Sequence, residues 1–145
     1  MKLSGRASLM TIVAVAAILL VVGLFLFSKE SLSSVATRFL QALDAGDVAT
    51  LTKMSYLDKD TEEEMRKKWD FAVNKAGRFY RFRYEITAAR QVSPDSAQVS
   101  MQFIKDALNP NAFPEKIDLP LVKVGGEWKV DVKAMSRDMY PALPR

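Results

Sequence analysis

The pattern of apolar and polar positions changes twice along the chain. Residues 10–27, MTIVAVAAILLVVGLFLF, form an unbroken run of eighteen residues without a charge, an amide or a proline. From Leu32 to Ala76, apolar residues recur every three or four positions, the period of amphipathic helices. From Tyr80 onward the period becomes two, as in half-buried strands. The pattern therefore predicts an apolar helix, then amphipathic helices, then strands.

The apolar run has the length of a membrane span. Eighteen helical residues rise roughly 27 Å, close to the thickness of a bilayer's hydrocarbon core. We therefore predict a transmembrane helix over residues 10–27. A cleaved signal peptide is the alternative interpretation, because Val35-Ala36 offers a weak cleavage site, although signal-peptide apolar regions are usually shorter. The positions taken to represent the anchor are Met10, Ile12, Val15, Leu19, Val22, Phe25 and Phe27.

The residues that flank this run predict its orientation. Lys2 and Arg6 precede it without any acid, whereas Lys29 is followed directly by Glu30. Positive residues stay on the cytoplasmic side of a membrane. We therefore expect residues 1–9 in the cytoplasm and the remaining domain in the periplasm, with a bacterial inner membrane as the location and membrane lipids as one partner.

The helical region contains three predicted helices. After a linker over residues 28–32, the first helix ends at Gly46, where a left-handed residue is favoured. Asp47 begins a short second helix, and Asp60 or Thr61 begins a third that ends at Gly77. The triplet Glu62–Glu64 lies in the first turn of the third helix, where the helix dipole favours acids.

Four strands follow. The first two, from Tyr80 to Ala88 and from Ala97 to Lys105, are joined by a turn at residues 93–96. The third spans Ile117–Val124, with Pro120 indicating an edge or a bulge. Gly125-Gly126 joins it by a tight hairpin to the fourth strand, residues 127–132. Because the helices alone can cover the apolar face of such a sheet, the sequence predicts an α+β roll.

Two stretches resemble a known family. VATRFLQALDAGDVATL resembles the opening helix pair of nuclear-transport-factor-2-like (cystatin-like cone) domains, and IDLPLVKVGGEWKVDV resembles their closing hairpin. The resemblance covers roughly residues 33–132 and is nearest to bacterial lumazine-binding-like domains of unknown function. It implies a cone-shaped roll over residues 33–134, with three helices on a curved four-stranded, mostly antiparallel sheet. It also implies that Trp128 packs under the helices.

The same resemblance leaves several functions open. The family includes isomerases and dehydratases that use an Asp base, Tyr or Asp donors or His pairs, and non-catalytic members that bind proteins. It also includes membrane-tethered assembly subunits of type IV secretion systems. This chain has no histidine, and its pattern places no acid clearly inside the cone.

Composition narrows the candidate chemistry. The chain has no cysteine and no histidine, so disulfides, thiolate chemistry and the commonest zinc ligand are excluded. Beyond residue 27 there are 19 basic and 17 acidic residues, a net charge of +2. This balance does not indicate nucleic-acid binding. We expect no catalytic residues, no metal and no cofactor.

Three groups of residues are candidates for a site. Tyr56, Tyr80 and Tyr84 could line a pocket and donate hydrogen bonds, with Asp70 or Asp106 as a base if buried. Aromatic core positions and solvated acids are the alternative interpretation. The other two groups are candidate interaction surfaces: the basic residues Arg78, Arg81 and Arg83, and the apolar residues Met139, Tyr140 and Leu143 of an extended tail over residues 135–145.

These observations favour a non-enzymatic single-pass membrane protein. Its periplasmic domain is expected to act as an accessory, assembly or scaffold subunit of a larger membrane complex, with other subunits as partners. A membrane-tethered binder of a small apolar ligand in the cone is the alternative. An isomerase-like enzyme with an Asp-Tyr site is the third hypothesis.

Overall fold

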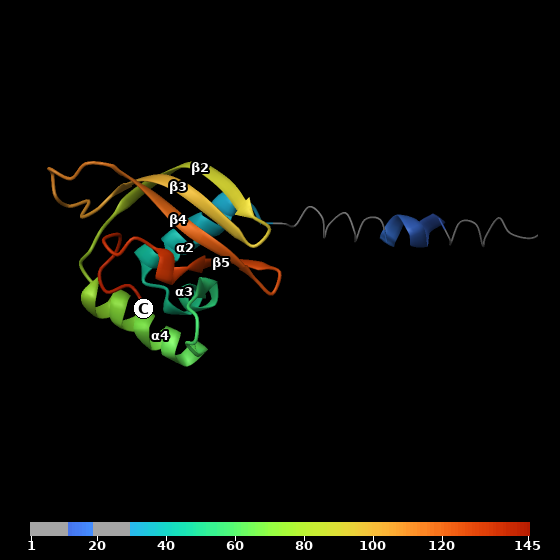
Figure 1. Cartoon of the computed structure of the whole chain (residues 1–145), viewed down its shortest axis with the longest axis horizontal. Helices are drawn as coiled ribbons and strands as arrows, with labels where there is room; N and C mark the ends of the chain where they lie inside the picture. Colours follow the sequence, from blue (N-terminus) through green and yellow to red (C-terminus); the bar gives the residue numbers. More distant parts are fainter. Residues whose placement is uncertain (1–11, 19–29) are drawn as a thin grey trace, which may run out of the picture. The chain divides into compact units, whose positions relative to one another are not determined.

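The computed structural model describes residues 12–18 and 30–145 (Figure 1). Residues 12–18 are helical, but most of the predicted anchor, including Met10, Leu19, Val22, Phe25 and Phe27, lies outside the described residues. Among those residues, no helix combines the length and the apolar character needed to cross a bilayer. The chain divides after Glu30, and the unit Ser31–Arg145 forms the domain described below.

The predicted helix pair is present. Helix α2, Leu32–Ala45, begins with the Ser31 side chain accepting the amide of Ser34, so the predicted linker ends one residue early. Gly46, at φ 68°, ends it in the left-handed region that glycine tolerates best. Helix α3, Val48–Met54, begins at Asp47, whose carboxylate accepts the amide and the hydroxyl of Thr50.

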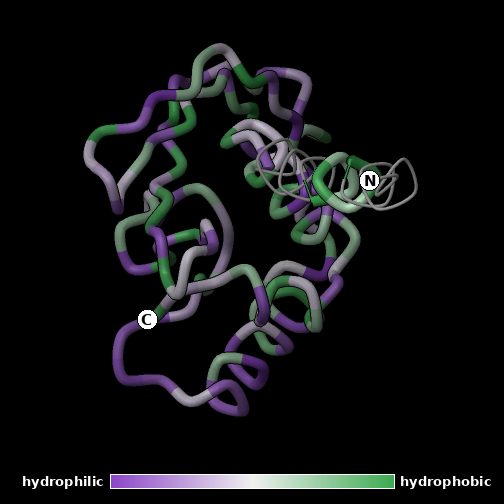
Figure 2. The backbone as a smooth tube through the Cα atoms, turned by 90° about the vertical axis from the view of Figure 1, so that its right-hand side faces the viewer, coloured by the Kyte–Doolittle hydropathy of each residue, from purple (hydrophilic) through white to green (hydrophobic). Residues whose placement is uncertain are grey.

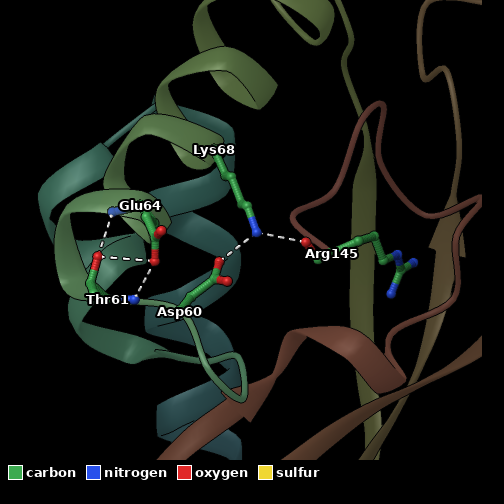
Figure 3. Close-up of polar contacts among 5 residues, drawn as sticks. All are labelled: Asp60, Thr61, Glu64, Lys68 and Arg145. Carbon is green, nitrogen blue, oxygen red and sulfur yellow. Dashed lines mark hydrogen bonds and ion pairs between the residues drawn. The ribbon is translucent and has the colours of Figure 1, made fainter.

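Helix α4, Glu62–Phe71, begins with a capping box. The Thr61 hydroxyl accepts the Glu64 amide at 3.2 Å, and the Glu64 carboxylate accepts the Thr61 amide at 2.8 Å (Figure 3). A π-helical stretch, Ala72–Ala76, continues α4 to Gly77. Most of α4 is hydrophilic (Figure 2), and it buries only Met65 and Trp69.

The sheet contains the four predicted strands: β2, Arg83–Ser93; β3, Ser96–Ile104; β4, Glu115–Val124; and β5, Glu127–Asp131. A two-residue strand that the sequence did not predict, β1, Ser55–Tyr56, pairs with β5 in parallel. The order in space is β1-β5-β4-β3-β2. The described domain is therefore α+β, with a five-stranded mixed sheet. Pro120 lies just outside the β4–β5 ladder, whose first paired residue on β4 is Leu121.

The core lies between the helices and one face of the sheet. Every second residue of β3, from Ala97 to Phe103, is buried against it. The indole of Trp69 meets the ring of Phe39 edge-on at 5.8 Å and donates to the hydroxyl of Ser55 at 2.9 Å. The core tryptophan is thus Trp69. Trp128 is only half-buried: it packs against the edge of this core, and its ring centre also lies 5.6 Å from the ammonium of Lys123.

The end of the chain joins this core, and the prediction of an extended tail was wrong. A 3-10 turn, Val132–Ala134, leads into residues 136–145, called here the C-terminal segment. Met139, Tyr140 and Leu143 are 0%, 4% and 7% exposed. The compact unit therefore extends to Arg145 and does not stop at residue 134.

Candidate functional site

An aromatic cluster occupies the start of β2. The ring of Phe82 stacks on Phe103 of β3 at 5.1 Å and lies 6.2 Å from Tyr84. Tyr140 meets Tyr80 edge-on at 5.2 Å and Phe82 at 6.2 Å. The alternation of residues 80, 82 and 84 directs these rings to the core side of the sheet, as the sequence predicted. The C-terminal segment then covers them.

Several hydrogen bonds hold the C-terminal segment in this position. The hydroxyl of Tyr80 donates to the carbonyl of Met139 at 3.1 Å, and that of Tyr140 donates to the carbonyl of Gly77 at 3.4 Å. The ammonium of Lys68 donates to Asp60 and to the main-chain oxygen of Arg145, both at 2.6 Å (Figure 3).

The side chain of Arg145 adds a further attachment. Its guanidinium donates to three carbonyls of the turn that precedes the segment, those of Val132, Lys133 and Met135. Met139, Tyr140 and Leu143 therefore do not form the predicted interaction surface, because the domain itself uses them as core.

Burial changes the chemistry of the tyrosines. It raises the pKa of Tyr80, Tyr84 and Tyr140 above the ordinary value of 10.0, and a hydrogen bond from the backbone of Asp106 partly offsets the effect at Tyr80. These hydroxyls are thus protonated donors at neutral pH. Two of them donate to main-chain carbonyls of the domain.

The three candidate tyrosines do not line one pocket. Tyr56 lies on β1 and lines a separate cleft of about 490 Å³ between α3, the start of α4 and β5. That cleft is polar and charged, with Lys53, Asp58, Asp60 and Lys129 among its lining residues. The predicted pocket of Tyr56, Tyr80 and Tyr84 is therefore wrong, because β1 and β2 are the two opposite edges of the sheet.

The two candidate acids lie in solvent. Asp70 is exposed on α4 and accepts a hydrogen bond from the Asn74 amide at 2.7 Å. Asp106 is exposed in the β3–β4 loop, with φ 47°. The solvated interpretation of both acids is confirmed. Within residues 12–18 and 30–145, the acidic side chains form no group of three or more that could hold a metal ion.

The predicted basic residues are exposed as expected. Arg81 precedes β2 and donates to the carbonyls of Arg78 and Tyr80, which stabilises the turn before the strand. The guanidinium of Arg78 lies 5.2 Å from the ring centre of Phe79. Arg83 begins β2 and is also exposed.

Sequence reasoning missed three exposed apolar side chains near these arginines. Phe79, Leu108 and Phe113 are 77%, 72% and 69% exposed. Phe79 lies in the turn 77–82, and the other two lie in the loop 105–114. The amide of Ala107 donates to the carbonyl of Arg81 at 2.7 Å, so the two segments are adjacent. The alternation of apolar and polar residues could have identified Phe79. Tyr80, Phe82 and Tyr84 face the core, so the odd-numbered Phe79 is expected to face outward.

We call this region the loop end: the turn 77–82, the loop 105–114 and Arg83. An ion pair of 2.8 Å between Lys105 and Glu115 closes the base of the loop. Within the domain, both segments lie at the left of Figure 1, whereas the β2–β3 and β4–β5 hairpin tips and the start of α2 lie at the right. The hairpin tips touch each other, since the main-chain amide of Lys123 donates to the main-chain carbonyl of Asp95 at 2.8 Å.

Of the comparisons with known proteins, the one with solved structures bears on the fold. No family model matches the chain, and no curated protein does. Among solved structures, an uncharacterised protein with a cystatin-like fold from Caulobacter vibrioides matches with a TM-score of 0.51 and 13% identity, over 68% of this chain and 80% of that one. This likeness shows the cystatin-like fold alone.

Two further structures have lower scores. An NTF-2 like protein of unknown function from Shewanella oneidensis MR-1 matches with a TM-score of 0.48 and 10% identity, over 68% of this chain and 89% of that one. A ketosteroid isomerase-like protein from Erwinia carotovora atroseptica has a TM-score of 0.46 and 17% identity, with 68% and 86% covered.

Proposed function

We propose that the chain is a non-enzymatic, single-pass membrane protein whose periplasmic cone domain, of the lumazine-binding-like type, is an accessory or assembly subunit of a larger membrane complex. Residues 10–27 would form the anchor, for which their uncharged sequence is the support. The domain Ser31–Arg145 would carry the contacts with the other subunits.

The observation that carries this proposal is the composition of the loop end. Three large apolar side chains, Phe79, Leu108 and Phe113, are each more than two-thirds exposed on adjacent segments. Soluble surfaces rarely hold large apolar side chains together unless they bind something. Aromatic residues and arginines are also the residue types enriched in protein interfaces. The loop end has both.

The aromatic cluster supports a binding role more than a catalytic one. A catalytic tyrosine needs a hydroxyl that reaches a substrate. The hydroxyls of Tyr80 and Tyr140 instead hold the C-terminal segment against the domain, and Asp70 and Asp106 lie in solvent. No described donor–acid pair is therefore arranged for proton transfer at this cluster.

The proposal is tested on the full-length chain in its native membrane. Membranes are washed with alkaline carbonate, solubilised in mild detergent and separated on native gels. We expect the chain to remain in the washed membranes and to migrate with a larger complex. Truncating two central interface anchors commonly costs more than about 2 kcal/mol. The double variant Phe79→Ser/Phe113→Ser should therefore leave that complex.

The matched control is Phe71→Ser. Phe71 is also an exposed phenylalanine, at 55%, but it lies on α4 and borders the C-terminal segment, outside the turn 77–82 and the loop 105–114. This variant should keep the complex. Release of the chain by carbonate would contradict the anchor. Equal loss of the complex in both variants, or migration of the wild-type chain alone, would contradict the accessory role.

A further inference from the structure

The sheet has one long open edge. Strand β2 ends the order β1-β5-β4-β3-β2 and is eleven residues long, whereas β1, at the other edge, has two residues. Among the described residues, no element pairs with the outer side of β2. A long exposed edge presents unpaired amides and carbonyls that can hydrogen-bond to another strand. The β2 edge therefore needs an explanation.

A bulge divides β2 into two halves whose side chains have opposite phase. In the first half, Ile86 pairs with the buried Met101 and so faces the core, while Glu85 pairs with Gln102 on the outer face. The register shifts between Ile86 and Ala88. After it, Ala89 pairs with the buried Val99, and the even-numbered Arg90 faces outward.

We propose that β2 pairs antiparallel with β2 of a second copy of this chain, about a two-fold axis between Thr87 and Ala88. This register places Glu85 opposite Arg90 of the other copy, and Arg90 opposite Glu85. Both members of each pair lie on the outer face, so two ion pairs form across the interface. The same register pairs Ile86 with Ala89 on the core face.

The bulge selects this register. Cross-strand partners must lie on the same face of a sheet. Shifting the pairing by one residue places Glu85, on the outer face, opposite Ala89, on the core face, and is therefore excluded. Shifting it by two in one direction places Arg83 opposite Arg90, which brings like charges together. Shifting it by two in the other direction places Glu85 opposite Val92 and Arg90 opposite Thr87, which leaves both charges unpaired. Of these registers, the proposed one pairs residues of the same face and of opposite charge.

The centre of the interface is small. Thr87, Ala88 and Ala89 surround the axis and carry no bulky side chain that would hold a second strand away. Glu85 and Arg90, which lie on either side of the axis, supply the charges. A second copy is thus the occupant that fits, because each copy places an acid, Glu85, opposite the other copy's Arg90, whose guanidinium, among the described residues, donates only to the Gln98 side chain, at 3.4 Å. The pairing involves β2 alone and is independent of the proposed membrane complex.

The test is charge exchange in the full-length chain, purified in mild detergent, with dimerisation measured by analytical ultracentrifugation. Glu85→Arg and Arg90→Glu should each raise the dimer dissociation constant about tenfold or more, since each converts two attractive pairs into repulsive ones. The double variant Glu85→Arg/Arg90→Glu should restore it to within about threefold. Glu127→Arg, an exposed strand residue on β5, is the control and should leave it unchanged.

Cysteine cross-linking provides a second readout, because the native chain contains no cysteine. Mixed copies carrying Thr87→Cys and Ala88→Cys should form a disulfide-linked dimer on oxidation, whereas Thr87→Cys mixed with Ser93→Cys should not. A wild-type chain that stays monomeric at about 100 μM would overturn the proposal and leave the β2 edge to a strand of another protein. Single and double charge variants with equal dissociation constants would overturn it as well.

Discussion

Residues 105–114 and residues 136–145 are similar as sequences but differ in the folded domain. Each has two prolines, a leucine and an aromatic residue, and neither shows a helical or strand period. Yet Leu108 and Phe113 of the first are about 70% exposed, whereas Tyr140 and Leu143 of the second are buried. The difference cannot come from composition, since the two segments have nearly the same apolar content.

The difference comes from what each segment meets. The loop 105–114 is held at its base by the Lys105–Glu115 ion pair and by one amide at Ala107, and its tip contacts little. The C-terminal segment lies over the open side of the aromatic cluster, where Gly77 leaves room for the ring of Tyr140. A segment without a period is buried when the rest of the fold offers a complementary surface.

The largest expected effect comes from truncating one aromatic residue in each segment. Tyr140→Ala should lower the free energy of unfolding by about 3–5 kcal/mol, because it removes a buried ring and leaves a cavity. Phe113→Ala should change it by no more than about 0.5 kcal/mol. Urea unfolding of the full-length chain, followed by the fluorescence of Trp69 and Trp128, measures both. Equal losses in the two variants would show that the loop is packed as firmly as the C-terminal segment.

The second expected effect tests the packing of the Tyr140 ring against Gly77. A Cβ at Gly77 would overlap the hydroxyl of Tyr140 and lie 2.5 Å from its ring carbon Cζ. Gly77→Ala should therefore cost about 1–3 kcal/mol, since the buried ring must move. The backbone is not the cause, because φ at Gly77 is −98°. In a Tyr140→Ala background most of this cost should disappear.

The control is a second glycine substitution whose cost in stability has a different physical cause. At Gly126, where φ is 83°, an added Cβ would meet no atom within 4 Å, so Gly126→Ala is strained only through its backbone. Its cost should be the same with and without Tyr140→Ala. If the Gly77→Ala cost were also the same in both backgrounds, the ring of Tyr140 would not occupy the space beside Gly77.

These two segments also show which parts of the fold could be predicted. The helices α2, α3 and α4 and the strands β2 to β5 have a period and recognisable ends, such as Gly46, Thr61 and the Gly125-Gly126 turn, so the α+β roll followed from local rules. Strand β1 could not be predicted. Two residues carry no period, and Ser55–Tyr56 forms a strand only because β5 lies beside it.

The candidate site was predicted less well, for the same reason. The exposed arginines and the inward direction of Tyr80 and Tyr84 follow from alternation along one strand. Excluding Tyr56 from their group required knowing that β1 and β2 lie at opposite edges of the sheet. Assigning Met139 and Tyr140 to a partner surface failed because the partner surface lies within the same domain, 59 to 63 residues away in sequence.

The smallest expected effect is a difference between the two segments in how their contribution to the free energy of unfolding depends on pH. Burial raises the pKa of the Tyr140 hydroxyl, so the folded state holds this proton more tightly than the unfolded state does. Below the ordinary value of 10.0 both states are protonated, and the contribution to stability is complete. As pH rises past about 10, the unfolded state ionises first, and the contribution is lost as pH passes through the folded-state pKa.

Tyr140→Phe removes that titration while keeping the ring, so its free energy of unfolding, compared with that of the wild type between about pH 8 and pH 11, isolates the hydroxyl. The advantage of the wild type should be constant up to about pH 10 and then shrink. In the loop, the hydrogen bond to Glu115 raises the pKa of Lys105 in the same direction, but that pair is partly exposed, so Lys105→Met should alter the profile less. A difference between Tyr140→Phe and the wild type that stays constant to pH 11 would mean that the Tyr140 hydroxyl ionises as readily in the folded chain as in water, and the C-terminal segment would then be no more buried than the loop.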